Sequence, residues 1–396
     1  MARPALELAG IFRQHGPAYR QAHCLPLHQW RLMQAIETCR TAALGGHVEQ
    51  CGHCQHIRIS YNSCRNRHCP KCQSLARARW LEQRKAELLP VEYFHVVFTV
   101  PAEIAAIAFY NKEVVYDILF RTTAETLLTI AGDPKHLGAE IGFFAVLHTW
   151  GQNLLHHPHL HCVVPGGGLS PDHDRWIACR PGFFLPVRVL SRLFRRLFLE
   201  ALQKAFAADQ LQFFGDLEPL RHPQAFARYL NPLLKTEWVV YAKPPFGGPQ
   251  QVLEYLGRYT HRVAISNERL VSLENGQVTF RWKDYRHQQR RRVMTIPAQE
   301  FIRRFLLHAL PPGFTRIRYY GFLANCHRRD KLNLCGELLR APLAELLPHP
   351  ADYRDFYAAL TARSLRLCPQ CGVGTMVRTE ILPPGHAPVP ALLDSS

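Results

Sequence analysis

Two histidines in an extended segment constrain the fold of this chain more than any other feature. Residues 149–169 read TWGQNLLHHPHLHCVVPGGGL, and within them His159 and His161 flank Leu160. Because side chains alternate along a strand, both imidazoles point to one face and the leucine to the other. Two neutral nitrogen ligands then lie side by side, which indicates a divalent metal site. The proline and glycines at residues 165–168 end the strand in a loop.

A second segment, residues 249–266, predicts an amphipathic helix that carries two tyrosines. Tyr255 and Tyr259 are one turn apart, so both phenols project from one face. They could be core residues, but Arg258 and Arg262 lie in the same turns and suit phosphate better than a buried face. A tyrosine can act as a nucleophile where a metal polarises the phosphate that it attacks. The tyrosine helix therefore favours a metal-binding role for the two histidines. Without it, they could be packed or surface histidines.

At these residues the chain resembles a known family. His159-Leu160-His161 is similar to the histidine-hydrophobe-histidine motif of the HUH endonucleases. The stretch YLGRYTHR resembles the two-tyrosine motif of the IS91-like rolling-circle insertion-sequence transposases. Residues 61–73, 280–286 and 301–325 resemble that family too, so the resemblance covers nearly the whole chain in the family's order.

The resemblance implies a transposase that cleaves and transfers single-stranded or hairpin DNA at the ends of an insertion sequence. Tyr255 or Tyr259 would attack a DNA phosphate and give a 5′-phosphotyrosine and a 3′-hydroxyl. Two tyrosines would let two strands be held at once. Each transesterification conserves bond energy, and the sequence has no GxxxxGK[ST] loop, so ATP is not expected.

The sequence leaves the third metal ligand open. His148, at the end of the preceding strand, and Gln152, in the turn, could each reach the metal. His157 would share their face only if the strand already began there, and Pro158 argues against that. A nitrogen-rich site with water-filled positions suits Mg²⁺ or Mn²⁺.

The cysteines predict zinc. The chain has thirteen cysteines, an odd number, and six of them form CxxC pairs, with histidines nearby. This pattern indicates metal binding in a reducing compartment and not a disulfide framework. The spacing of two pairs predicts one tetrahedral site, and the cysteines and histidines left over around them predict a second, interleaved one. Zinc would supply folding energy to a segment with little apolar core. The first site comprises Cys51, Cys54, Cys69 and Cys72, and the second Cys39, His47, Cys64 and His68, with His53 and His56 as rival ligands.

The C-terminal part holds a further pair, Cys368 and Cys371, within CPQCG. A lone pair needs two more ligands to hold a third zinc. The candidates for those ligands are Cys326, His327 and Cys335. From residue 383 the chain is rich in proline, and we expect disorder there.

The charge of the chain indicates a polyanionic partner. It has 48 lysines and arginines against 31 aspartates and glutamates, a net charge of +17 that is spread along the sequence. Near the cysteine pairs, Arg65, Arg67 and Lys71 are expected to contact DNA. The sequence shows no long apolar span and no secretory signal, so we expect no membrane contact. A bacterial cytoplasmic protein, associated with the nucleoid when bound to DNA, is the expected setting.

The order of elements predicts an α+β fold. Apolar strands at residues 93–101 and 142–150 flank two helical segments, and the histidine strand follows, which fits an antiparallel sheet backed by helices. Asn275-Gly276 between alternating runs predicts a hairpin. The resemblance implies that the nuclease core is ferredoxin-like or RNA-recognition-like.

Three domains are expected from this order. The zinc-binding, DNA-binding domain covers residues 1–90 and the HUH catalytic domain residues 91–300. Residues 301–396 form a helical, basic C-terminal region.

Two other functions share part of this pattern. A plasmid relaxase or replication initiator would use the same histidine and tyrosine chemistry, but the cysteine-rich front matches the transposases better. A non-catalytic zinc-finger regulator would explain the charge and the cysteines, but not the paired histidines and tyrosines.

Overall fold

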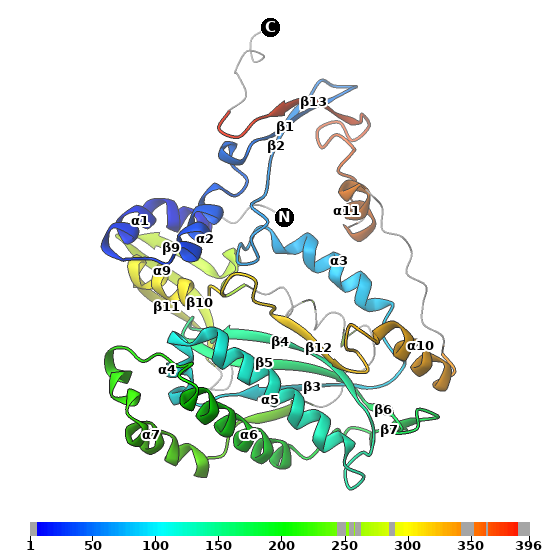
Figure 1. Ribbon diagram of the computed structural model, residues 1–396. Coiled ribbons are helices and arrows are strands. Elements are labelled where there is room, and N and C mark those ends of the chain that lie inside the picture. Colours follow the sequence, from blue (N-terminus) through cyan, green and yellow to red (C-terminus); the bar gives the residue numbers. More distant parts are fainter. Residues whose placement is uncertain are drawn as a thin grey trace. The chain divides into compact units, whose positions relative to one another are not determined.

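The chain forms two compact units, each assembled from stretches that are far apart in the sequence (Figure 1). The first unit comprises Met1–Trp80, His261–Ala309 and Leu346–Ser396, and the second comprises Leu81–Thr260 and Leu310–Glu345. The three domains expected from the sequence are continuous stretches, whereas both units are discontinuous. The computed structural model describes residues 6–243, 251–252, 257, 263–284, 290–341, 352–361 and 363–386.

The second unit is built on a five-stranded antiparallel sheet. The strand predicted at residues 93–101 is present as β3, and that at 142–150 as β4; the histidine strand, β5, lies between them. Every neighbouring pair in the sheet is antiparallel, as the sequence predicted. The strand order is β12 (Ile317–Gly321), β4 (Gly142–Trp150), β5 (His156–Pro165), β3 (Tyr93–Thr99) and β8 (Val240–Lys243).

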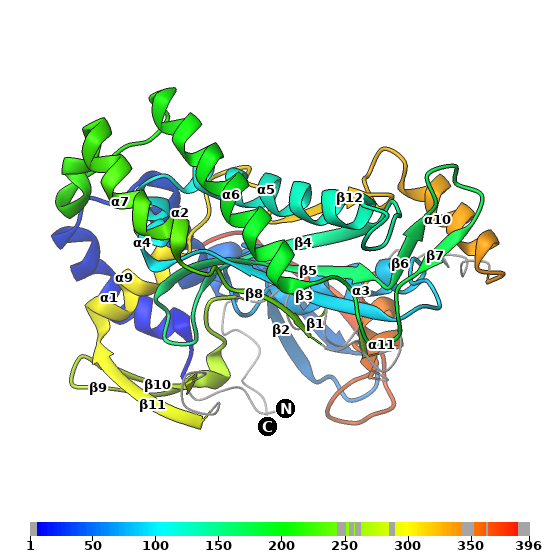
Figure 2. The same ribbon diagram turned by 90° about the horizontal axis from the view of Figure 1, so that it is seen from below.

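Helices cover one face of this sheet (Figure 2). Leu160, Cys162 and Val164 of β5 point into the core on that face, with alternate residues of β3 and β4 beside them. The core is completed by apolar residues of α4 (Ala102–Tyr110), α5 (Lys112–Gly132), α6 (Val187–Ala207) and α7 (Pro223–Lys235). The mixed helices and antiparallel sheet confirm the predicted α+β class.

The first unit contains a three-stranded sheet packed with three helices. The sheet consists of β9 (Leu270–Glu274), β10 (Gln277–Asp284) and β11 (Arg290–Pro297), with β10 in the middle. Asn275 and Gly276 join β9 to β10 with φ values of 49° and 72°, so the predicted hairpin is confirmed. The helices are α1 (Leu8–Ala22), α2 (Leu27–Thr38) and α9 (Ala298–Leu307).

A second small sheet of this unit joins the two ends of the sequence. Strand β1 (Gly46–Cys51) pairs with β2 (Ile57–Tyr61) on one side and with β13 (Met376–Leu382) on the other. Figure 1 shows the red C-terminal strand beside the blue β1. The sequence alone predicts no strand in this C-terminal segment. The N-terminal cysteine-rich module therefore includes a strand from the far end of the chain.

The other described elements are short helices, strands and connections. They are η1 (Ala42–Leu44), α3 (Gln73–Lys85), β6 (Gly167–Leu169), β7 (Trp176–Ala178), η2 (Gly215–Arg221), η3 (Asn267–Arg269), α10 (Arg328–Leu338) and α11 (Tyr353–Thr361). No helix within the described residues is long and apolar enough to cross a membrane.

Candidate metal centres and family relationship

The two histidines of the strand motif lie on the sheet face opposite the helix layer. Leu160 between them is fully buried in the core, so the alternation along β5 turns His159 and His161 to the other face. On the adjacent strand, His148 lies directly opposite His159 in the β4–β5 register. Three imidazoles from two neighbouring strands thus meet on one rigid surface.

The geometry of the three histidines suits a single metal ion. One ligand nitrogen from each of His148, His159 and His161 lies within 4.8 Å of the others. The Nδ1 atom of His159 is 2.7 Å from the carbonyl oxygen of His157. A carbonyl oxygen only accepts, so Nδ1 carries the proton and Nε2 is the nitrogen that can bind a metal.

A fourth histidine, His95 on β3, supports this cluster and was not singled out from the sequence. Its Nε2 atom is 2.8 Å from Nδ1 of His161, and the planes of the two rings are nearly parallel, at 6° to each other. Burial lowers the pKa of His95 to about 3, so its ring is neutral near pH 7 and can accept the Nδ1 proton of His161. His161 then presents Nε2 to a metal, as His159 does. Within the apolar run YFHVVFT, His95 reads as a core residue, and only the strand pairing reveals its partner.

Of the two residues that the sequence left open as third ligand, the structure brings His148 into the cluster. Its ring is stacked on Trp150 with the centroids 4.7 Å apart. Gln152 lies in the turn between β4 and β5. Contrary to the expectation from Pro158, the strand already includes His157, because β5 begins at His156 and contains the proline. His157 nevertheless lies outside the three-histidine cluster.

The tyrosine helix lies largely outside the described residues. Tyr255 and Tyr259, and the flanking Arg258 and Arg262, all fall there. Their assignment as nucleophiles and DNA contacts therefore stays a prediction.

Eight cysteines form two clusters of four. The first cluster combines the CxxC pair Cys69 and Cys72 with two cysteines that belong to no such pair. The sulfur atoms of Cys39 and Cys72 are 3.4 Å apart, and those of Cys64 and Cys72 are 3.6 Å apart. The fourth thiol belongs to Cys69, and all four sulfur atoms lie within 4.8 Å of one another. Four thiols at these separations can hold a tetrahedral zinc ion.

The second cluster combines Cys51 and Cys54 with Cys368 and Cys371. This corrects the predicted grouping of Cys51 and Cys54 with Cys69 and Cys72. The C-terminal pair is likewise completed by N-terminal thiols, and not by the candidates at residues 326, 327 and 335. Backbone N–H groups, that of Gly374 foremost, lower the pKa of Cys371 to about 6, which favours the thiolate that binds metal.

Neither histidine of the predicted interleaved site belongs to a cluster among the described residues. His47 lies on β1 with Nε2 3.8 Å from a carboxylate oxygen of Glu49. The backbone N–H of His68 donates to the side chain of Asn66. The pairing of β1 with β13 brings the C-terminal thiols to Cys51 and Cys54. Cys69 and Cys72 then join the other cluster in place of the two histidines.

Comparison with known proteins places these features in a family. The chain is 67% identical over 384 residues to "Putative transposase y4qJ" of Sinorhizobium fredii, covering 96% of each chain. It is 29% identical over 307 residues to the transposase for insertion sequence element IS801 of Pseudomonas savastanoi pv. phaseolicola, covering 76% of this chain and 70% of that one. Residues 11–100 match the family described as transposase zinc-binding domain, and residues 142–331 match that described as putative transposase. The chain belongs to the IS91-like transposase family.

The two matched ranges of the transposase contain different candidate metal sites. The first cysteine cluster lies within residues 11–100, which supports Zn²⁺ as its metal. The three clustered histidines lie within residues 142–331. No solved structure matches the transposase.

The basic residues expected to contact DNA surround the first cysteine cluster of the transposase. Arg65 is exposed and has a positive φ of 52°, whereas Arg67 is half-buried. Lys71 forms an ion pair with Glu7, so this lysine is already engaged within the unit. Arg65 is therefore the most accessible of the three.

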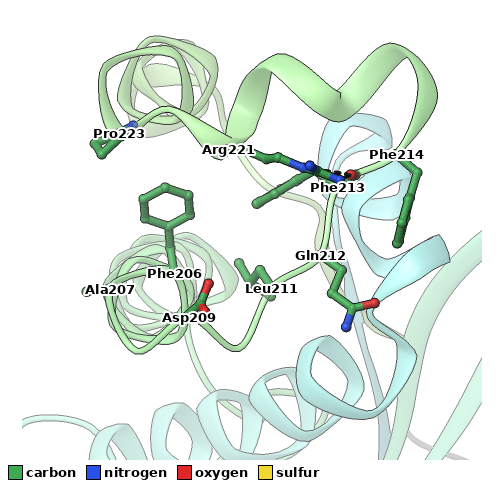
Figure 3. Close-up of a pocket in the computed structure, with 9 residues that line it drawn as sticks. All are labelled: Phe206, Ala207, Asp209, Leu211, Gln212, Phe213, Phe214, Arg221 and Pro223. Carbon is green, nitrogen blue, oxygen red and sulfur yellow. Dashed lines mark hydrogen bonds between the residues drawn. The ribbon is translucent and has the colours of Figure 1, made fainter.

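A hollow of about 760 Å³ lies between α6, η2 and α7 of the transposase (Figure 3). The ring of Phe206 and the side chain of Leu211 line it, and Arg221 donates to the carbonyl oxygen of Phe213 beside it. Asp209 is the only other charged residue in its lining. The hollow offers no group of metal ligands, in contrast to the histidine face of the sheet.

Proposed function

We propose that this transposase is an HUH-type endonuclease that cleaves and joins single-stranded DNA at the ends of its insertion sequence. The observation that carries the proposal is the cluster of His148, His159 and His161 on the sheet face opposite the helices. Imidazoles from adjacent strands are held by backbone pairing, so their positions change little between the resting and the reacting protein.

The three histidines would hold Mg²⁺ or Mn²⁺, with His159 and His161 binding through Nε2. A metal there would polarise an oxygen of the scissile phosphate and so lower the cost of charge in the transition state. The three imidazole nitrogens are the reason that this site suits such a metal. Three neutral nitrogens leave positions for water and phosphate, and the hydrogen bonds at Nδ1 of His159 and His161 fix both rings.

Tyr255 or Tyr259 supplies the nucleophile in this proposal. The phenol oxygen forms a bond to phosphorus and loses its proton, while the bond from phosphorus to the 3′-oxygen breaks and that oxygen gains a proton. The products are a 5′-phosphotyrosine and a 3′-hydroxyl. The reverse step, with a 3′-hydroxyl from another strand, transfers the DNA without an external energy source.

Single-stranded or hairpin DNA is the proposed substrate. The net charge of +17 supplies attraction to phosphate, and the first cysteine cluster with Arg65 lies in the zinc-binding domain. The transposase relatives and this domain favour transposition over a plasmid relaxase or initiator. The three-histidine cluster is not explained by a purely DNA-binding regulator.

The test is metal-dependent cleavage of labelled single-stranded oligonucleotides that tile both ends of the insertion sequence. Cleavage by the full-length protein is expected to vanish with a chelator and to return with Mg²⁺ or Mn²⁺. His159→Ala with His161→Ala should lower the rate by at least about 100-fold, because the metal loses two ligands.

His157→Ala is the matched control, because this exposed residue lies on the same strand outside the cluster. It should cleave like the wild type. Zinc content measured on each variant separates loss of the histidine site from loss of folding. Undiminished cleavage by the double variant, or in excess chelator, refutes the metal-dependent mechanism.

A further inference from the structure

The second cysteine cluster brings together two pairs of thiols from opposite ends of the chain. Cys54 and Cys368 are separated by 314 residues, yet their sulfur atoms are 3.6 Å apart. The sulfur atoms of Cys51 and Cys371 are 3.8 Å apart. A zinc ion with Zn–S bonds of about 2.3 Å in a tetrahedron places its sulfur ligands about 3.8 Å from one another. The two separations between the pairs match this value, and all four sulfur atoms lie within 4.8 Å of one another.

Both pairs adopt the same local turn around their first cysteine. The backbone N–H groups of His53 and Cys54 donate to the sulfur of Cys51 at 3.4 and 3.5 Å. On the C-terminal side, the N–H of Gln370 donates to the sulfur of Cys368 at 3.4 Å. Such N–H···S bonds stabilise thiolates and orient their lone pairs. Each pair is thus a preformed half of a four-thiolate site.

The approach of the two halves depends on a glycine. A Cβ atom at Gly374 would lie 2.4 Å from the sulfur of Cys51 and 2.7 Å from Cβ of His53. Both contacts are far shorter than van der Waals distance, so a side chain at this position would push the halves apart. Gly52, in the N-terminal half, has no such constraint, because its nearest neighbour would be 3.9 Å away.

Apart from the pairing of β1 with β2 and β13, few apolar contacts hold this part of the molecule together. The local core consists of Cys51, Cys368 and Met376, with Cys371 packed against it. So few apolar groups give little free energy of folding, whereas a four-thiolate zinc site can supply most of it. The sulfur separations exceed the 2.05 Å of a disulfide, so the arrangement is that of four separate ligands.

We infer that Cys51, Cys54, Cys368 and Cys371 form a second structural zinc site, which fastens strand β13 to β1. The zinc-binding domain found by comparison ends at residue 100 and contains only half of these ligands. The complete module is therefore assembled from both ends of the chain and cannot form without residues 368–382. The inference is independent of the proposed cleavage mechanism.

The test is the zinc content of the purified full-length protein, measured by native mass spectrometry and by elemental analysis. The wild type should hold two zinc ions per chain, one for each cysteine cluster. Gly374→Ala should hold one, or lose the second at least about tenfold faster to a chelator, although every thiol is retained. Cys368→Ser with Cys371→Ser should also hold one.

Gly52→Ala and Cys326→Ser are the matched controls and should keep two. Cys326 is exposed and lies in neither cluster. If the cysteine variants do not fold, alkylation of the wild type gives the same answer. The N-terminal and C-terminal thiols of the second cluster should be protected together and become reactive together when a chelator is added.

One zinc ion in the wild type overturns the inference, as does a Gly374→Ala protein that retains both ions with wild-type kinetics. A wild-type mass lower by the two hydrogens of a disulfide would do the same. Iron in place of zinc, visible as colour and by elemental analysis, would overturn the identity of the metal.

Discussion

At the scale of single residues, the hydrogen bond between His95 and His161 leaves Nε2 as the nitrogen of His161 that can face the proposed metal. The two nitrogens are 2.8 Å apart on neighbouring strands, and both side chains are buried. When Nε2 of His161 binds a metal, its ring proton lies on Nδ1, and a neutral His95 accepts that proton. The residue acts through His161 and is a positioning residue, not a catalytic one.

His95→Leu removes this acceptor while keeping an apolar filling for the strand. We expect the Mn²⁺ concentration for half-maximal cleavage to rise by about 10- to 100-fold, with the rate at saturating metal largely restored. His95→Gln, whose amide oxygen can accept the same proton, should recover most of the affinity. Isothermal titration with Mn²⁺ measures the affinity directly. An equal loss of rate at every metal concentration would indicate a purely structural role.

At the scale of elements, the start of β5 is tied to two helices through a half-buried histidine, His156. His156 donates from Nδ1 to the carbonyl oxygen of Ala105 in α4 and accepts at Nε2 from the hydroxyl of Tyr116 in α5. Burial lowers the pKa of His156 to about 4, because the protonated ring would lose water without gaining an acceptor.

This histidine predicts that stability falls as the solution becomes acidic. The unfolded chain binds the proton near pH 6.5 and the folded chain only near pH 4, so the contribution is full above pH 6.5 and is lost toward pH 4. From pH 7 to pH 5 the contribution of His156 to the free energy of unfolding falls by about 2 kcal/mol. Urea unfolding at both pH values should show His156→Gln losing less stability than the wild type over this interval. Equal losses would contradict the assignment.

Elements with a local signal were predictable from the sequence. The alternation around Leu160 and the apolar runs of β3 and β4 gave the sheet and its histidine face, and Asn275-Gly276 gave the hairpin. The spacing of the CxxC pairs indicated zinc, since each pair is formed within four residues.

What depended on distant contacts was not predictable. Spacing cannot tell which cysteine pair meets which, and the segment MVRTEIL of β13 lacks the regular alternation that would mark it as a strand. His95 was missed for a similar reason, because its role exists only through pairing with β5. The sequence identified the types of residue that could bind metal, whereas the tertiary structure determined which of these residues cluster together.

At the scale of the whole molecule, the transposase has its two kinds of candidate metal ligands in different units. The thiol clusters lie in the unit that contains both ends of the chain, and the histidine cluster lies in the unit built on the five-stranded sheet. Thiolates suit a closed, structural zinc site, whereas three imidazoles leave room for phosphate. The division suggests that stability of the cysteine-rich module and chemistry on DNA can be altered separately by mutation.

The most direct test of the proposed mechanism is the covalent protein–DNA adduct. Incubated with Mn²⁺ and an oligonucleotide labelled on the 3′ side of the cleavage point, the wild type should form an adduct whose peptide contains Tyr255 or Tyr259. Tyr255→Phe with Tyr259→Phe should form none while still binding the oligonucleotide. Tyr241→Phe, which removes an exposed phenol of β8, should behave like the wild type. An adduct that persists in the double variant, or that maps to another residue, would contradict the account.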